Sequence, residues 1–196
     1  MIRSPGYCGV ILAAGTPERL SKSLSRWPEG NPLGSTLLST QVDALNTVSE
    51  LVLVVAGSNE AVLTPTVYAH GGFVVSTSGC GDFECLQLGV REVLNRGRDT
   101  AIVTSGDMSP LPPLDYRALC DAYQQSDRET WAVALKSAGT NSYPLIAGRE
   151  LIEELLRASA TSSLQDVLVA NAAHVLRVHL GEATECAQAQ RVQNNS

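Results

Sequence analysis

Two periodicities of apolar residues alternate along the chain, and they predict strands and helices in turn. Apolar runs of strand length lie at residues 7–13, 51–55, 73–75, 101–103, 131–135 and 174–180. Predicted helices lie at 35–48, 82–95, 114–125, 149–157 and 162–170, and Asp82 is placed to cap the free N–H groups of the second. Short uninterrupted apolar runs are typical of strands that are covered on both faces of a parallel sheet. We therefore expect a three-layer α/β/α fold with an open, mostly parallel sheet and right-handed crossovers.

Length and composition favour one folded unit. A chain of 196 residues can bury a substantial core in a single domain. Hydrophobic residues make up 44% and charged residues 17%, which suggests neither disorder nor a fibrous repeat. We expect the domain to span residues 1–187 and a flexible tail to follow at 188–196.

Charge and hydropathy restrict the partners. The formal net charge of −6 opposes broad attraction to nucleic acid or to anionic lipid. No apolar run approaches the roughly 20 residues of a membrane span, and no signal-peptide pattern is present. We expect a cytoplasmic protein that binds neither nucleic acid nor membranes, and the pattern leaves its oligomeric state open. The odd count of five cysteines argues against a disulfide framework, and we expect Cys8, Cys85 and Cys120 to be buried.

The end of the first predicted strand is the first candidate site, because ligands of open α/β sheets bind beyond the carboxyl ends of strands. Leu12-Ala13-Ala14-Gly15 has small side chains that let backbone N–H groups approach phosphates. Arg19 and Lys22 follow on the same loop, where a guanidinium can bridge two phosphate oxygens and an ammonium adds a point charge. The spacing matches neither the Walker loop nor Gly-x-Gly-x-x-Gly, so a plain turn is also compatible with it.

Asp107 is the second candidate, since it comes directly after the apolar run at 101–103 and so lies at the same edge of the sheet. A hard divalent cation takes oxygen ligands and needs only one or two carboxylates when substrate phosphates complete its shell. Asp107 therefore suits Mg²⁺, and a turn-capping aspartate is the alternative.

Together the two loops resemble the MobA-like NTP transferases, a family that includes molybdenum-cofactor guanylyl- and cytidylyltransferases. The chain carries Leu12-Ala13-Ala14-Gly15, Arg19 and Lys22 after its first strand, and Asp107 and Pro110 after a middle strand. Fainter similarity covers most of the chain, at 31–33, Gly81, Leu86, Gly89 and 143–146. The resemblance implies a Rossmann-like sheet of the nucleotide-diphospho-sugar transferase type.

The resemblance also implies site residues and a reaction. The backbone of Leu12, Ala13, Ala14 and Gly15 would bind the nucleotide together with Gly81, while Lys22 holds its phosphates and Asp107 holds Mg²⁺. An acceptor oxygen would attack the α-phosphate of CTP or GTP, and Arg19 and Lys22 would stabilise the leaving pyrophosphate. The acceptor would be a small phosphorylated or hydroxyl compound, such as molybdenum cofactor.

Two departures from the family pattern keep an alternative open. Lys22 lies closer to Arg19 than is typical, and relatives carry an acidic segment where this chain has only Glu182 as a candidate second metal ligand. A catalytically silent protein that binds a nucleotide or cofactor on the same fold is therefore the alternative. A dinucleotide-binding oxidoreductase is disfavoured, because the glycine spacing differs and no acidic residue ends the run at 51–55.

Overall fold

The computed structural model describes residues 6–15, 17–26, 34–78, 81–135 and 143–179. The strands are β1 (Tyr7–Leu12), β2 (Leu51–Ala56), β3 (Phe73–Ser76), β4 (Thr100–Ser105), β5 (Ala132–Leu135), β6 (Leu145–Gly148) and β7 (Val175–Val178). The helices are α1 (Pro17–Ser23), α2 (Leu37–Asn46), α3 (Glu60–Ala69), α4 (Asp82–Asn95), α5 (Pro113–Gln125), α6 (Arg149–Arg157) and α7 (Leu164–Ala170), with a 3₁₀ turn at Ala172–His174. The expected tail at 188–196 lies outside the described residues.

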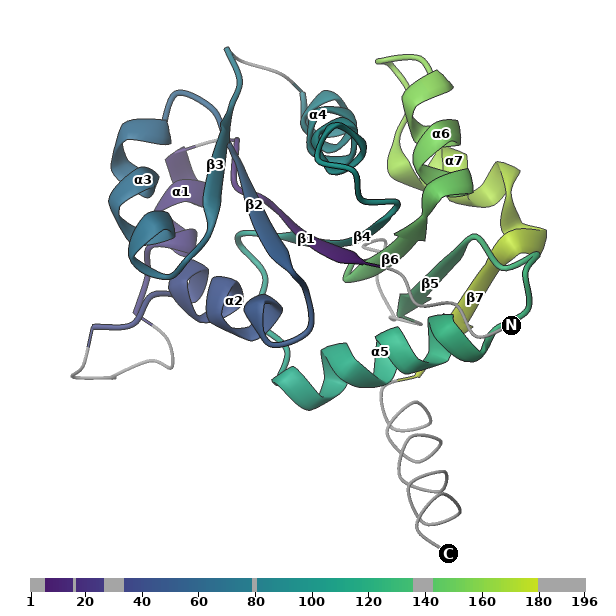
Figure 1. The fold of residues 1–196 in the computed structure, drawn as a ribbon. Helices are drawn as coiled ribbons and strands as arrows, with labels where there is room; N and C mark the ends of the chain where they lie inside the picture. Colours follow the sequence, from purple (N-terminus) through teal and green to yellow (C-terminus); the bar gives the residue numbers. More distant parts are fainter. Residues whose placement is uncertain (1–5, 16, 27–33, 79–80, 136–142, 180–196) are drawn as a thin grey trace, which may run out of the picture.

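The seven strands of the described residues form one sheet in the order β3-β2-β1-β4-β6-β5-β7. Only β6 runs antiparallel to its neighbours, β4 and β5, and every other pair is parallel. Helices α2 and α5 cover one face, and α4 and α6 cover the other (Figure 1). The predicted three-layer, mostly parallel α/β fold is therefore confirmed.

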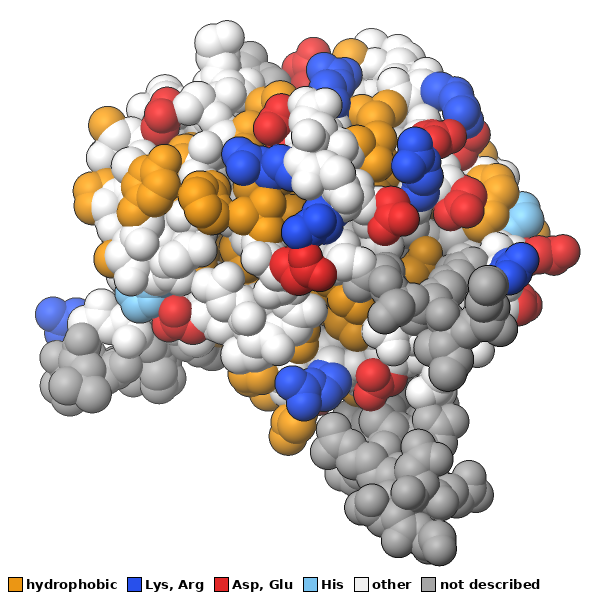
Figure 2. Space-filling model, viewed as in Figure 1, with side chains coloured by type: hydrophobic (Ala, Val, Ile, Leu, Met, Phe, Trp, Pro, Cys, Tyr) orange, Lys and Arg blue, Asp and Glu red, His pale blue; other side chains and the backbone are white. Residues whose placement is uncertain are grey.

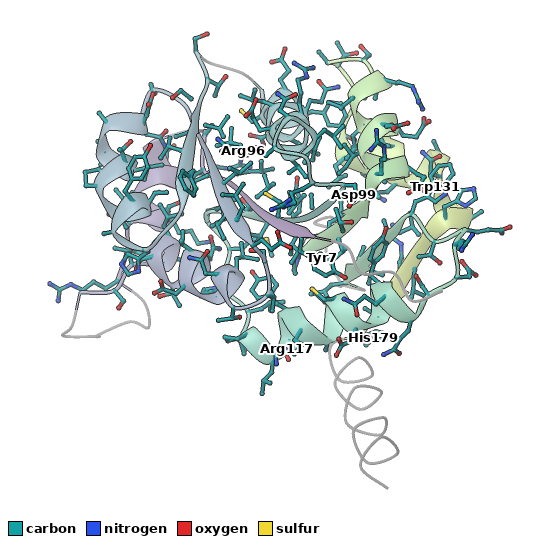
Figure 3. All side chains as sticks on the ribbon, in the orientation of Figure 1. Tyr7, Arg96, Asp99, Arg117, Trp131 and His179 are labelled. Carbon is teal, nitrogen blue, oxygen red and sulfur yellow. The ribbon has the colours of Figure 1, made fainter. Side chains whose placement is uncertain are left out.

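Two apolar layers hold the helices on the sheet. One layer joins α4, α6 and α7 to the sheet around Val10, Val55 and Val103, and the other joins α2, α3 and α5 to it around Ile11, Val54 and Ile102. Neighbouring residues of one strand thus serve opposite layers, which explains the uninterrupted apolar runs. Figure 3 shows Tyr7 between the sheet and α5, where its hydroxyl donates to the Cys120 carbonyl at 3.2 Å.

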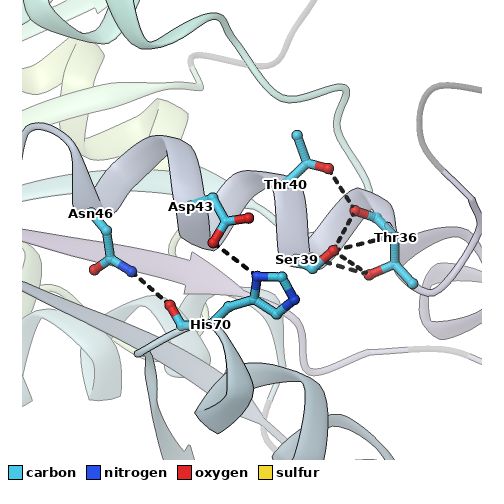
Figure 4. A network of polar contacts seen from close by, with 6 residues as sticks. All are labelled: Thr36, Ser39, Thr40, Asp43, Asn46 and His70. Carbon is cyan, nitrogen blue, oxygen red and sulfur yellow. Dashed lines mark hydrogen bonds and ion pairs between the residues drawn. The ribbon is translucent and has the colours of Figure 1, made fainter. Parts of the chain in front are cut away.

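Three elements escaped sequence prediction. Helix α3 contains Pro65 and has no strong amphipathic pattern. It is tied to α2 by the His70 ring, 2.8 Å from Asp43, and by Asn46, which donates to the His70 carbonyl (Figure 4). Helix α1 is short, and β6 has only four residues that run directly into α6. Short elements such as these are specified by tertiary packing more than by local pattern.

Cys8, Cys85 and Cys120 are buried, as predicted. Cys8 and Cys120 are free thiols. Cys85, in contrast, is disulfide-bonded. An odd cysteine count leaves at least one thiol unpaired but does not exclude a single bridge, so this part of the cysteine prediction was wrong.

The surface of the described residues combines charged and apolar regions. Acidic and basic side chains are interspersed on the face seen in Figure 2, and apolar side chains gather there over α3 and β3. Tyr68 and Phe73 meet edge to face with ring centroids 6.3 Å apart, and the Arg96 guanidinium lies over the Phe73 ring. No helix in the described ranges is long and apolar enough to span a bilayer.

Candidate functional site

The loop after β1 is held close to β2 and β4. The Ala13 N–H donates to the Val55 carbonyl at 2.9 Å, and Asn59 donates to the Ala13 carbonyl at 2.8 Å. Asn59 is buried and also accepts a hydrogen bond from the Gly57 N–H at 2.9 Å. These contacts fix the backbone at the carboxyl end of β1 in one conformation.

Gly15 lets the chain turn from β1 into α1, which carries Arg19. Its φ of +152° is unusual for L residues, and a Cβ there would lie 3.1 Å from the Arg19 Cδ. Arg19 lies in α1 rather than in an open loop. Its side chain lies back over the Gly15 bend.

The loop after β4 carries Asp107 alongside the β1 loop. The Gly106 N–H donates to the Leu12 carbonyl at 2.9 Å, and a Cβ on Gly106 would lie 3.2 Å from the Ala13 Cβ. The Ser105 hydroxyl donates a short hydrogen bond to the Asp107 carboxylate, which orients it. The side chain of Asp107 is 25% exposed, so it is accessible while remaining well ordered by its neighbours.

Arg19 joins this loop to α4 through two carboxylates. Its Nη1 lies 2.8 Å from Oδ1 of Asp82, and its Nε lies 3.6 Å from Oδ2 of Asp107. We expected Asp82 to cap α4 through its side chain. The N-cap is instead Gly81, whose N–H donates to the Glu84 carboxylate, so the Asp82 carboxylate is available for Arg19.

Glycine at position 89 sets how closely α4 approaches the sheet. A Cβ on Gly89 would lie 2.7 Å from the Val10 Cγ1 and 3.1 Å from the Val55 Cγ2. Because both valines are buried in the sheet, only glycine lets α4 pack at this distance. The N-terminus of α4, with Asp82, is thereby brought to the carboxyl edge of β1.

These segments surround a cavity of about 530 Å³. Its lining comprises Leu12, Ala14, Arg19, Gly81, Asp82, Phe83, Cys85, Leu86, Ser105, Asp107, Tyr143, Ala160, Ser162, Ser163, Leu164 and Gln165. Charged groups thus meet apolar and hydroxyl-bearing walls, a composition typical of small-molecule sites. Burial raises the pKa of Tyr143 above its usual range, the Asp82 carboxylate raises it further, and Arg19 opposes the change. Its hydroxyl therefore stays protonated at neutral pH.

The cavity brings together five of the nine residues that the sequence indicated: Leu12, Ala14, Arg19, Gly81 and Asp107. Ala13 is buried beneath the lining and Gly15 is exposed outside it. Lys22 faces a separate shallow depression lined by Glu18, Ser21, Lys22 itself and Ser25. Glu182 lies outside the described residues. The cavity gives the positions of the other residues, and the roles assigned to all nine stay predictions.

Sequence reasoning missed a second part of the cavity wall. Tyr143 was noticed only as part of a faint similarity, and the segment at 160–165, which runs from the connection after α6 into the start of α7, gave no chemical signal. Its serines and glutamine resemble an ordinary polar connection, and only the fold brings them to the cavity.

Asp107 is a carboxylate of the cavity lining that could hold a divalent cation. The described residues contain no cluster of three or more His, Cys, Asp or Glu side chains that could hold a metal by themselves. Mg²⁺, however, commonly uses one or two carboxylates together with substrate phosphates and water. A partly exposed carboxylate beside a guanidinium and a cavity fits a cation shared with a phosphate-bearing ligand.

A mostly parallel sheet with a cavity of charged and apolar groups at the carboxyl edge of β1 and β4 is the architecture of an open α/β protein that binds a small ligand beyond the ends of its central strands. The family model of the MobA-like NTP transferase domain matches residues 9–175. The chain therefore belongs to the MobA-like NTP transferase family. No curated protein matches it significantly.

Solved structures share this fold at low sequence identity. Rv0371c from Mycobacterium tuberculosis H37Rv is 19% identical, with a TM-score of 0.70, over 91% of this chain and 89% of that one. A second structure of Rv0371c, a complex with manganese, has a TM-score of 0.67 at 19% identity and covers 90% of this chain and 89% of that one. A nucleotidyl transferase from Methanothermobacter thermautotroptrophicus is 16% identical, with a TM-score of 0.68, over 99% of this chain and 100% of that one.

Proposed function

We propose that this protein is a Mg²⁺-dependent nucleotidyltransferase. It transfers a nucleoside monophosphate from CTP or GTP to a small phosphorylated or hydroxyl acceptor and releases pyrophosphate. The observation that carries the proposal is the meeting of Arg19 and Asp107, 3.6 Å apart, at one cavity beyond the carboxyl ends of β1 and β4. Membership of the MobA-like NTP transferase family supports the same class of reaction.

In the proposed reaction, an acceptor oxygen attacks the α-phosphorus of the NTP. A new phosphorus–oxygen bond forms, the bond between the α-phosphorus and the bridging oxygen to the β-phosphate breaks, and pyrophosphate leaves with that electron pair. A proton from a hydroxyl acceptor passes to solvent. The backbone between Leu12 and Gly15 would hold the nucleotide, and Arg19 would turn to the β- and γ-phosphates, whose developing charge it stabilises. No protein nucleophile is needed.

Asp107 would hold the divalent cation. When bound, Mg²⁺ supplies charge that orients the α-phosphate and offsets the charge of the leaving group. The hydrogen bond from the Ser105 hydroxyl orients the Asp107 carboxylate at the cavity. Rv0371c, which has a similar fold, has been crystallised as a complex with manganese, and this supports a divalent cation in the proposed reaction. Molybdenum cofactor is one candidate acceptor, because the family includes enzymes that act on it.

The test is Asp107→Asn, which removes the charge and keeps the shape of the side chain. Pyrophosphate release is measured with each NTP, Mg²⁺ and a panel of acceptors. We expect a loss of at least about 100-fold, the size found when one group that stabilises transition-state charge is removed. The matched control is Asp115→Asn, which removes the same charge in the first turn of α5, outside the cavity lining. Unchanged turnover in Asp107→Asn, or no nucleotide binding by the native protein, would refute the proposal.

A second candidate is a catalytically silent nucleotide-binding protein. It is favoured by the present partners of Arg19, which is held between two carboxylates, and by the position of Lys22 outside the cavity. Calorimetry separates the two candidates. Binding of CTP or GTP without pyrophosphate release across the acceptor panel would favour the silent protein, and turnover would exclude it.

A further inference from the structure

One buried amide clamps both ends of the turn that carries Asp107. The turn spans residues 105–108 and is closed by the Met108 N–H, which donates to the Ser105 carbonyl at 3.1 Å. The Nε2 of Gln41 donates to the carbonyl of Ser105 at 2.9 Å and to that of Met108 at 2.7 Å. Since an amide nitrogen carries two hydrogens, both contacts are made at once. Asp107 lies between the two clamped residues.

Gln41 makes these contacts from the middle of α2, more than sixty residues earlier in the chain. Its side chain is fully buried, and α2 is fixed by a capping box at Thr36 and by the apolar layer beneath it. The amide therefore ties both ends of the turn to a rigid helix on one face of the sheet.

The amide oxygen of Gln41 indicates that a contribution to stability does not by itself explain this residue. The Oε1 of Gln41 is buried and has no hydrogen-bond partner among the described residues. A buried acceptor without a partner is destabilising, which partly cancels the gain from the two hydrogen bonds. An apolar side chain of the same size would avoid that cost, although it would leave the two carbonyls unclamped.

We propose that Gln41 is a positioning residue that holds the Asp107 carboxylate in place for the divalent cation. The inference rests on the proposed role of Asp107 and adds a residue that does not line the cavity. Groups that orient a metal-binding side chain typically change metal affinity or activity by about 10–100-fold when they are removed.

The experiment compares the native protein with Gln41→Met, which keeps the length and approximate volume of the side chain but removes both N–H donors and the unpaired oxygen. Gln41→Asn is the second variant, because its shorter amide cannot reach both carbonyls and it remains informative if the first variant does not fold. The matched control is Asn46→Leu, which removes an amide on the same helix that donates to the His70 carbonyl at 2.8 Å, away from the turn.

Two readouts are measured besides turnover. Hydrogen exchange of the Met108 amide, without any ligand, reports whether the turn is still clamped. Calorimetric titration with Mn²⁺, with CTP or GTP present, reports the affinity for the cation. In the Gln41 variants we expect at least about 10-fold faster exchange at Met108 and about 10-fold weaker Mn²⁺ binding, with exchange in β1 unchanged. The Asn46 control should resemble the native protein in both.

The outcomes separate this inference from the proposed function. Unchanged exchange at Met108, or native Mn²⁺ affinity in a folded Gln41 variant, overturns the role of Gln41. A native protein that binds Mn²⁺ in a Gln41-dependent way but never releases pyrophosphate refutes the transferase and leaves the positioning role standing. If the native protein does not bind Mn²⁺ even with nucleotide, the role of Gln41 fails together with that of Asp107.

Discussion

The proposed role of Arg19 implies that Asp82 competes with the nucleotide for its guanidinium, so that removal of the Asp82 charge should strengthen nucleotide binding. The Asp82 carboxylate lies 2.8 Å from the Arg19 Nη1, so a triphosphate must displace it before the guanidinium can bridge phosphate oxygens. Asp82→Asn keeps the shape of the side chain at the start of α4 but removes the charge that holds Arg19. It also removes a negative charge from the cavity lining.

The exposure of the pair sets the size of the effect. The side chains of Arg19 and Asp82 are 42% and 69% exposed, and ion pairs this open to solvent contribute about 0.2–1 kcal/mol. The nucleotide has to break this ion pair in the native protein but not in Asp82→Asn, so the variant should bind CTP or GTP about 1.4- to 5-fold more tightly. Because salt screens exposed charges, the gain should shrink when the salt concentration is raised from about 50 mM to about 500 mM.

The assay is isothermal titration calorimetry with non-hydrolysable CTP and GTP analogues and Mg²⁺. Glu92→Gln is the matched control, because it lies on the same helix, changes the net charge equally and removes an arginine contact of 3.8 Å to Arg96 outside the cavity. An equal gain in the Glu92 variant would mean that net charge alone is responsible. Weaker binding in Asp82→Asn would mean that Asp82 aligns Arg19 for the nucleotide, and the competition argument would be wrong.

Two further predictions concern the framework of the site. Asn59→Asp replaces the donor to the Ala13 carbonyl by a carboxylate oxygen, so urea denaturation should show a loss of about 1–3 kcal/mol in the free energy of unfolding. Burial raises the pKa of the Cys8 and Cys120 thiols from 9.0 to about 12, so iodoacetamide should modify neither at pH 8 until the protein is unfolded. Because the thiol pKa is higher in the folded than in the unfolded protein, the protonated thiols favour the folded state. This contribution to the free energy of unfolding is complete below about pH 9 and is lost as the pH rises to about 12, which unfolding measured as a function of pH would reveal.

The sequence was sufficient to predict which segments meet at the candidate site wherever a single strand decided the geometry. β1 and β4 are central, covered on both faces and adjacent, so their apolar runs predicted them and their carboxyl ends had to meet. The small residues after β1 and the carboxylate after β4 therefore fell at one edge of the sheet. Lys22 could not be placed in the same way, because a residue on α1 faces the cavity or solvent according to the rotation of that helix.

The far wall of the cavity was beyond sequence reasoning for a different reason. Strand β6 inserts antiparallel between β4 and β5, and this reversal brings Tyr143 and the segment at 160–165 towards the carboxyl edge of β1. A four-residue apolar run such as that of β6 does not indicate in which direction the strand runs in the sheet or which strands lie beside it. Only the complete sheet order determines which distant polar residues share the cavity.

The ion pairs of Arg19 show most clearly the same limit of prediction from sequence. The positions of Arg19 and Asp107 along the chain predict phosphate and cation binding, whereas Asp82 was predicted to be a helix cap because aspartate is common there. Gly81 takes that position, and the close packing of α4 at Gly89 brings the carboxylate to Arg19 instead. The guanidinium is thus shared by two carboxylates before any substrate arrives. A residue type can be inferred from its place along the chain, but its partner depends on contacts made across the fold, and here those contacts determine how strongly a phosphate must compete.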